Sequence, residues 1–230
     1  MDQPKRILIG CPVRDRAWIL PRYLESLAGL DYPPENIEYV FVVNDSTDNT
    51  FSILQQFSKQ QVSPVHLIAI DFGNRRSADR GGYSINYLVK LRNILLETFL
   101  NTKCSHLFSV DSDILVKPHT LQELLKLDLP IVSSLVRNDW HLGDKGFFNI
   151  LRKQDEHLRP ITEFTRDQLI RVDCTGAAYL ISRMVVDDMG VRYHPHLQGE
   201  DAGFCEDARS KDITIWCHTG LECTHVMQRF

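Results

Sequence analysis

The sequence has 230 residues, of which 43% are hydrophobic and 24% charged, and its 26 Lys and Arg against 30 Asp and Glu give a net charge of −4. This length suits one α/β domain with a full core, and the composition excludes a disordered chain. A nucleic-acid binder shows a basic excess or a basic stripe, and this chain has neither. The longest apolar runs, such as 39–43, have the length of a strand and cannot cross a bilayer, so we expect no integral membrane segment.

The cysteines and the first residues predict a cytoplasmic protein. The six cysteines are scattered without a CxxC pair, which is typical of reduced core thiols in a cytosolic chain. The N-terminal residues lead directly into a strand and show no apolar signal-peptide region.

The first half of the chain alternates predicted strands with predicted helices. Apolar runs of strand length and apolar positions at helical spacing predict, in order, a strand at 6–13, a helix at 20–30, a strand at 38–43, a helix at 51–57, a strand at 65–70, a helix at 85–99 and a strand at 106–110. Such alternation predicts an α/β fold with a largely parallel sheet that helices cover on both faces.

Beyond residue 137 the alternation fades. We expect strands at 177–182 and 214–218, with loops around 140–148 and 194–203. No internal repeat, low-complexity segment or linker divides the sequence, so we expect a single domain over residues 1–230.

Ligands of such sheets bind beyond the carboxyl ends of the strands. Three polar segments occupy these places, at 12–15, 44–48 and 111–113. In the last of them, Asp111 and Asp113 are two residues apart, so in extended backbone both carboxylates address one cation while Ser112 turns away. Hard carboxylate oxygens suit Mn²⁺ or Mg²⁺ bridging to a diphosphate. The alternative is two acids that end a strand and cap the next helix.

Two later motifs also have two interpretations. Glu200 and Asp201 follow Gly199 at the start of a predicted helix, where they are either favourable partners of the helix dipole or a general base aimed at an acceptor hydroxyl. His225 is either a structural residue or a metal ligand or phosphate contact.

In this order, the motifs resemble glycosyltransferases of the GT-A fold, most closely those of family 2. The resemblance covers nearly the whole chain. Its elements are Cys11-Pro12-Val13-Arg14, Val43-Asn44-Asp45-Ser46-Thr47-Asp48, Leu91-Arg92-Asn93, Asp111-Ser112-Asp113, Thr175-Gly176-Ala177-Ala178, Gly199-Glu200-Asp201 and the terminal His225.

The resemblance implies a donor site in residues 1–115. Pro12 and Val13 would line the nucleotide base through backbone groups, with Arg14 also on the donor. Asp45 would accept a hydrogen bond from a uracil-like edge, and Arg92 would lie near the base or the diphosphate. A carboxylate at Asp45 favours UDP over CDP, with GDP as the main rival, so a UDP-sugar is the expected donor and a GDP-sugar the second.

The resemblance implies a cation and an acceptor in the rest of the site. Asp113 and His225 would hold Mn²⁺ or Mg²⁺ with Asp111 close by, and Ser112 would contact the donor. Residues 116–230 would bind a saccharide or another hydroxyl-bearing acceptor, with Trp140, Thr175 and Gly176 on the acceptor side. Asp201 would be the general base, and Glu200 would orient the acceptor hydroxyl.

Three departures refine the expected activity. The usual glycine of the Asp-Gly-Ser-Thr-Asp motif is absent, because Asn44-Asp45-Ser46-Thr47-Asp48 has none. The Gln-x-x-Arg-Trp motif and the membrane helices of processive synthases are also missing, so we expect a non-processive, inverting hexosyltransferase. Asp71-Phe72-Gly73 and Asp111-Ser112-Asp113-Ile114 also resemble the fungal mannan polymerase family, which retains anomeric configuration.

Two other functions compete with this one. A sugar-phosphate nucleotidyltransferase shares the architecture, but it carries a glycine-rich loop after its first strand, where this chain has Pro12-Val13-Arg14-Asp15-Arg16. A catalytically inactive sugar-binding or nucleotide-binding module would have lost the Asp-x-Asp or the Gly-Glu-Asp motif, and both are present.

Overall fold

The computed structural model describes residues 4–73, 84–138 and 146–227. The strands are β1 (Ile7–Val13), β2 (Ile37–Asn44), β3 (Val65–Ile70), β4 (His106–Val110), β5 (Ile114–Leu115), β6 (Ile131–Val136), β7 (Leu151–Gln154), β8 (His157–Pro160), β9 (Leu169–Val172), β10 (Ala178–Ser182) and β11 (Ile215–His225). The helices are α1 (Leu20–Ala28), a 3₁₀ turn (Pro34–Asn36), α2 (Thr50–Gln60), α3 (Ile85–Leu100), α4 (Thr120–Lys126), α5 (Arg183–Val186) and α6 (Glu200–Ser210).

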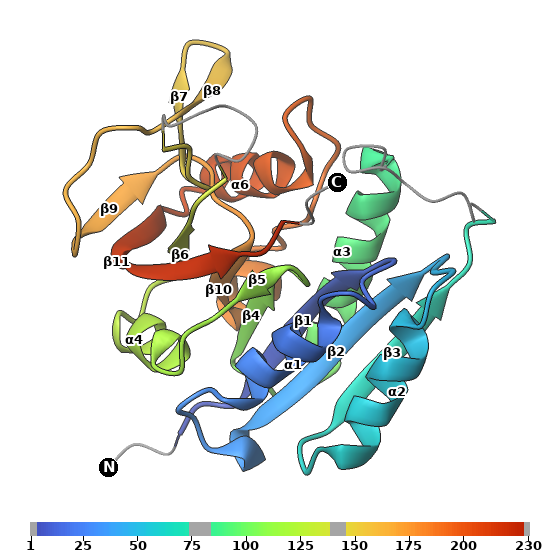
Figure 1. Cartoon of the computed structure of the whole chain (residues 1–230). Coiled ribbons are helices and arrows are strands. Elements are labelled where there is room, and N and C mark those ends of the chain that lie inside the picture. The colour runs from blue at the N-terminus through green and yellow to red at the C-terminus, as the bar shows by residue number, and fades with distance from the viewer. Residues whose placement is uncertain (1–3, 74–83, 139–145, 228–230) are drawn as a thin grey trace.

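One curled sheet joins strands from both halves of the chain (Figure 1). Among the described residues its order is β3-β2-β1-β4-β10-β6-β11-β5, and β9 pairs on β11. The first four strands are parallel; β10 runs against β4 and β6, and β11 is again parallel to β6. The predicted α/β fold with a mostly parallel sheet is therefore confirmed.

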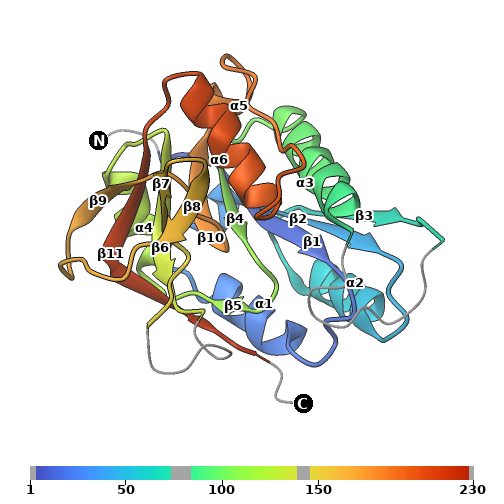
Figure 2. The same cartoon turned by 90° about the horizontal axis from the view of Figure 1, so that it is seen from above.

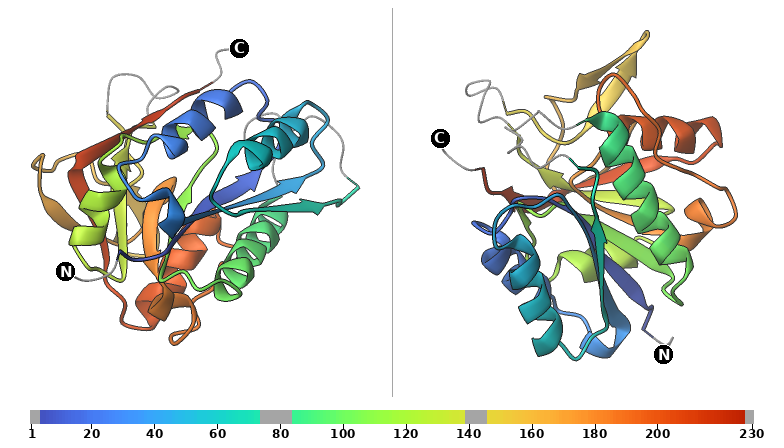
Figure 3. Two further views of the ribbon diagram at one scale, coloured as in Figure 1. Left: turned by 90° about the horizontal axis from the view of Figure 1, so that it is seen from below. Right: turned by 90° about the vertical axis from the view of Figure 1, so that its right-hand side faces the viewer.

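Helices cover both faces of the sheet, as Figures 2 and 3 show. On one face, α1, α2 and α4 pack in a core cluster through side chains such as Leu24, Leu54 and Leu121. On the other face, α3, α5 and α6 pack in a second cluster through side chains such as Leu95, Val185 and Phe204. Because the strands between them are covered on both sides, β1, β2 and β4 are buried along nearly their whole length.

The strands of the first half lie close to the predicted ranges, and those of the second half include several that the sequence did not predict. In β6 the buried Ser133 and Ser134 interrupt the apolar run, so periodicity does not reveal the strand. The hairpin β7–β8 is mostly exposed and carries little apolar pattern. Strand β11 runs on to His225, well past the predicted end at 218, with an irregularity between His218 and Glu222. None of the helices in the described ranges is long and apolar enough to span a membrane.

Candidate functional site

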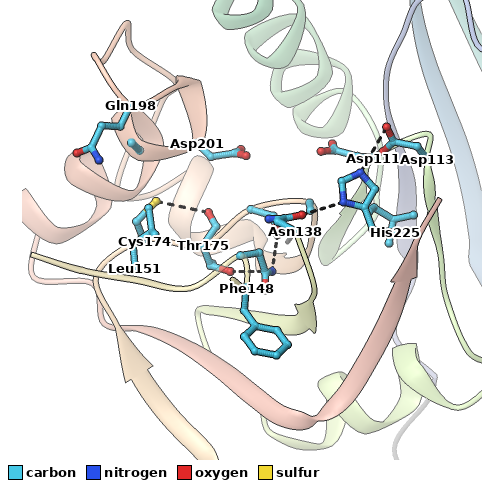
Figure 4. A pocket seen from close by; sticks show the side chains of 15 residues that line it. Asp111, Asp113, Asn138, Phe148, Leu151, Cys174, Thr175, Gln198, Asp201 and His225 are labelled. Carbon is cyan, nitrogen blue, oxygen red and sulfur yellow. Dashed lines mark hydrogen bonds and ion pairs between the residues drawn. The ribbon is translucent and has the colours of Figure 1, made fainter. Parts of the chain in front are cut away.

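Two cavities meet at the carboxyl end of β4. The larger has a volume of about 430 Å³ and lies among β6, β11 and the start of α6 (Figure 4). The smaller, of about 160 Å³, lies over the ends of β1 and β2. Both are lined by Asp111 and Asp113, which therefore stand at the boundary between the two cavities.

The two carboxylates at this boundary have different partners. Asp111 Oδ1 accepts a hydrogen bond from Arg92 Nη2 at 2.6 Å, whereas Asp113 Oδ2 lies 3.6 Å from Arg16 Nη2 and 3.7 Å from His225 Nε2. The expectation that both acids face one cation assumed extended backbone, but β4 ends at Val110 and the chain turns, with Ile114 N–H donating to Asp111 O. Asp111 is thus tied to Arg92, and Asp113 lies beside His225.

His225 reaches the acidic turn through strand pairing. It lies opposite Ile114 in the antiparallel register of β11 and β5. On the far side of its ring, Nδ1 is 2.8 Å from Asn138 Oδ1. Because an amide oxygen only accepts, Nδ1 is the donor in this contact, and Nε2 is the ring nitrogen that faces Asp113.

Asp113 and His225 fit a cation that the protein shares with a ligand. A carboxylate and a neutral imidazole are both ligands of Mn²⁺, but the described residues contain no group of three or more His, Cys, Asp or Glu side chains that would hold a metal ion on their own. An ion held by these two side chains would need further ligands from water or a bound phosphate, as is usual for Mg²⁺ at nucleotide sites.

Arg92 on α3 is the buried centre of the site. Its guanidinium donates to Ser109 Oγ at 3.1 Å and Asp111 Oδ1 at 2.6 Å, and lies 3.4 Å from Glu200 Oε1. Burial of a guanidinium requires such partners. The interaction explains why Glu200 lines the smaller cavity, whereas the sequence suggested that it orients an acceptor on the other side.

Asp201 lines the larger cavity, one residue further along α6 (Figure 4). The helix begins directly after Gly199. Its φ of 108° is a backbone conformation that glycine adopts readily, and it allows the sharp turn that the sequence predicted. Burial, reinforced by the neighbouring Glu200 carboxylate, raises the pKa of Asp201 above its usual range, although Arg92 opposes the shift. Asp201 is therefore a carboxylate with the raised basicity that a proton acceptor needs.

A buried asparagine shapes the wall opposite α6. Asn149 accepts a hydrogen bond from Val136 N–H, donates to Ser134 O and Gly176 O, and lies 3.3 Å from Thr175 Oγ1. These bonds fix Thr175 and Gly176, both lining the larger cavity, to the end of β6. Thr175 and Gly176, predicted on the acceptor side, therefore line the same cavity as Asp201, while Trp140 lies outside the described residues.

The smaller cavity contains most of the predicted donor residues. Pro12, Val13, Arg14, Arg92 and Ser112 line it, together with residues that the sequence reasoning missed, notably Arg16 and Asn44. The order of the motifs already pointed to this edge of the sheet. The apolar and helical patterns do not indicate which side chains within 12–16 and 44–48 line the cavity.

Asp45 lies in a neighbouring hollow and not in the smaller cavity. Its φ of 44° turns the chain, and it lines a separate hollow with Thr47 and Asp71. Its carboxylate accepts from Phe72 N–H at 2.9 Å and from Asn44 Nδ2 at 3.2 Å. The side chain that reaches the cavity at this strand end is Asn44, the residue before it.

The fold is shared with solved glycosyltransferases. S. aureus TarS in complex with UDP-GlcNAc matches with a TM-score of 0.63 and 15% identity, over 98% of this chain and 59% of that chain. The mannosyltransferase PcManGT from Pyrobaculum calidifontis, in complex with GDP-Man and Mn²⁺, matches with a TM-score of 0.63 and 15% identity, over 99% of this chain and 58% of that chain. The chain therefore has the GT-A fold of these glycosyltransferases.

The family follows from sequence. The family model Anp1 matches residues 1–173, and the chain belongs to the Anp1 family. A glycosyltransferase 25 family member of Drosophila melanogaster is 27% identical over 66% of this chain, and the mannan polymerase II complex anp1 subunit of Schizosaccharomyces pombe is 26% identical over 64%. The chain spans 27% and 39% of the length of these two relatives.

Proposed function

We propose that this chain transfers a hexose from a nucleotide-sugar donor to an acceptor hydroxyl, one sugar at a time. We propose inversion at the anomeric carbon because Asp201 lies on the acceptor side, whereas the mannan polymerase family retains configuration; the configuration of the product decides between the two. The donor occupies the smaller cavity and the acceptor the larger one, and Asp113 and His225 would hold Mn²⁺ or Mg²⁺. The observation that carries the proposal is the meeting of the two cavities at Asp111 and Asp113, with Asp201 on the acceptor side alone.

The charges around the smaller cavity support a diphosphate ligand. Arg14, Arg16 and Arg92 line it, and Arg16 already lies 3.6 Å from Asp113. Guanidinium groups pair with phosphate oxygens in bidentate geometry, so Arg14 and Arg16 would neutralise the charge that develops on the leaving diphosphate, while Arg92 stays paired with Asp111 and Glu200. When bound, the divalent cation supplies Lewis-acid stabilisation to the same leaving group.

The chemistry assigned to this chain's own residues is a single displacement. Asp201 accepts the proton of the acceptor hydroxyl as its oxygen forms a bond to the anomeric carbon. The bond from that carbon to the phosphate oxygen breaks, and its electron pair leaves with the nucleoside diphosphate. Thr175 and Gly176 line the acceptor's approach, and Arg92 keeps the carboxylates of Asp111 and Glu200 paired beside the donor.

The donor's base is read, in this proposal, by the side chain of Asn44. Its Nδ2 donates to Asp45 Oδ2, so its Oδ1 remains to accept from a ligand. An acceptor pairs with the N3–H of uracil or the N1–H of guanine and repels the unprotonated N3 of cytosine. We therefore propose a UDP-sugar as first donor and a GDP-sugar as second; the TarS and PcManGT complexes hold UDP-GlcNAc and GDP-Man.

An Asp201→Asn variant tests the proposal. We expect Mn²⁺-dependent release of nucleoside diphosphate from UDP-sugars or GDP-mannose, with saccharides as acceptors, to fall by about 10²–10⁴-fold, while nucleotide binding is retained. Asp212→Asn, an exposed residue just beyond the same helix, is the matched control and keeps the parental rate.

Four outcomes contradict parts of the proposal. An Asp201→Asn enzyme with more than half the parental rate removes Asp201 from the mechanism, and a product of retained configuration removes the inverting scheme. Pyrophosphate release from a sugar phosphate and a nucleoside triphosphate would instead identify a nucleotidyltransferase, and binding without turnover an inactive module.

A further inference from the structure

Two buried tyrosine hydroxyls lie behind Asp201, one on β10 and one in the segment before α6. Tyr179 and Tyr193 are at most 1% exposed, and their hydroxyl groups are hydrogen-bonded to each other. Tyr179 O–H also donates to Asp201 Oδ1 at 3.0 Å. A buried hydroxyl is costly unless it is paired, and phenylalanine would fill the same space without that cost. The two hydroxyls therefore point to a role beyond packing.

The direction of the two bonds follows from proton counting. A phenol has one proton, and Tyr179 donates its proton to Asp201 Oδ1. Tyr193 must then donate to the oxygen of Tyr179. The pair forms a short chain of donors that ends on the carboxylate, in which the second bond polarises the first.

Tyr193 is held rigidly at the start of this chain. Asn93 accepts from Tyr193 N–H at 3.0 Å and donates to Tyr193 O at 2.9 Å. The ring stacks on Phe204 with centroids 4.5 Å apart, and the Arg92 guanidinium lies 5.8 Å from its centroid. These contacts fasten the segment before α6 to α3, directly beside the arginine that faces the donor.

The other oxygen of Asp201 faces a glycine. A Cβ atom built on Gly176 would lie 2.1 Å from Asp201 Oδ2, far inside van der Waals contact. The absence of a side chain at Gly176 therefore leaves room for the carboxylate at the wall of the larger cavity. Oδ1 is bound by Tyr179, and Oδ2 faces Gly176, which lines the larger cavity together with Asp201.

We infer that Tyr179 and Tyr193 are positioning residues that hold Oδ1 of Asp201, so that Oδ2 is aimed at the acceptor hydroxyl across Gly176. The inference rests on the proposed function, because it needs Asp201 to be the base. The two tyrosines do not touch the reacting atoms, and they act through the orientation and the charge of that one carboxylate.

The same hydrogen bond favours the ionised form of Asp201. Burial and the carboxylates of Glu200 and Asp111 raise its pKa, whereas Arg92 and the Tyr179 hydroxyl lower it. These groups face Asp201 from α6, the turn after β4, α3 and β10. Removing the Tyr179 hydroxyl therefore raises the pKa of the base and moves the acid limb of the rate profile to higher pH.

The test is the kinetics of Tyr179→Phe and Tyr193→Phe in the full chain, with a UDP-sugar or GDP-mannose as donor. Loss of a hydrogen bond to a charged group typically changes a rate by about tenfold or more. We therefore expect kcat of Tyr179→Phe to fall at least about tenfold. Nucleotide affinity stays unchanged, and the acid limb of kcat/KM rises by about one pH unit. Tyr193→Phe gives a smaller change in the same direction.

Two further variants keep the test decisive if the substitutions of the two buried tyrosines destabilise the fold. Gly176→Ala pushes on Asp201 Oδ2 from the cavity side and should lower kcat with the acid limb unmoved, since it leaves the Tyr179 bond intact. Tyr32→Phe removes a tyrosine hydroxyl that donates to Lys5 O, far from the site, and should change neither parameter.

The failure of the inference is distinguishable from the failure of the proposed function. If Asp201→Asn abolishes turnover while Tyr179→Phe keeps both kcat and the parental pH profile, the base stands and the positioning role is overturned. If Asp201→Asn remains active, the proposed function loses its base and the inference falls with it. Equal losses in Tyr179→Phe and Tyr32→Phe would also overturn it, because they would indicate loss of fold only.

Discussion

The structure changes the expected recognition of the donor's base most at Asn44. In the proposed function its amide oxygen accepts from the base, because its amide nitrogen donates to Asp45. We expect UDP and GDP to bind at least about tenfold more tightly than CDP, since an unpaired buried polar group costs about 1–3 kcal/mol. In Asn44→Ala this preference should disappear, as measured by calorimetric titration with Mn²⁺. Equal affinities for UDP and CDP in the parent chain would contradict base reading here.

Asn138 illustrates a second residue that acts through its neighbour. Its Oδ1 lies 2.8 Å from His225 Nδ1 and sets which ring nitrogen faces Asp113. We expect Asn138→Ala to weaken Mn²⁺ binding in the presence of UDP by about 10–100-fold, the usual effect of losing an outer partner of a metal ligand. Asn138→Asp keeps an acceptor oxygen and should retain most of the affinity. Electron paramagnetic resonance of Mn²⁺ measures both, and an unchanged affinity in Asn138→Ala would refute the role.

At the scale of elements, helix α6 is the one whose position matters most, because it begins with Glu200 and Asp201. Its close approach to the preceding segment depends on Gly203, where a Cβ would lie 2.0 Å from His194 O. We expect Gly203→Ala to displace the helix and to destabilise the fold by about 1–3 kcal/mol, with a loss of turnover that exceeds the fraction unfolded.

Thermal unfolding and a transfer assay on the same protein measure both effects of Gly203→Ala. Gly29→Ala at the end of α1 is the comparison, because its Cβ would stay 3.2 Å from the nearest carbonyl and should cost less. A Gly203→Ala protein with parental melting temperature and turnover would show that α6 tolerates a shift.

At the scale of the whole molecule, ligand binding tests the tertiary structure, because the residues that line the two cavities come from distant parts of the chain. The proposed donor residues come from β1, β2, α3 and α6, and the proposed cation ligands from the turn after β4 and the end of β11. A ligand at about 100 times its dissociation constant adds roughly 2.7 kcal/mol of stability, or about 5–10 °C in melting temperature for a chain of this size. We expect UDP to produce this shift with Mn²⁺ and only a small part of it with EDTA.

Asp113→Ala serves as the control for the thermal shift. It should keep the parental melting temperature without ligand, because a carboxylate after the strand end contributes little to the core, and should lose the Mn²⁺-linked shift. An undiminished shift in Asp113→Ala would remove this residue from the cation site.

The sequence alone determined the order of strands and helices in the first half and the edge of the sheet where the site lies. Both are local properties: β1, β2, β3 and β4 are apolar runs, and polar residues follow at their carboxyl ends. The second half was less predictable, because β6 buries Ser133 and Ser134 and β7–β8 is exposed, so neither has the apolar pattern on which strand prediction depends.

Which side chains meet in the site was decided only by the tertiary structure. Asp111 and Asp113 are two residues apart, yet one pairs with Arg92 on α3 and the other lies beside His225 on β11. The Asp201 carboxylate meets Tyr179, more than twenty residues earlier in the chain, because β10 and α6 pack together. Short-range patterns report how a segment is buried, but partners of this kind depend on strand register and helix packing, which bring distant residues together.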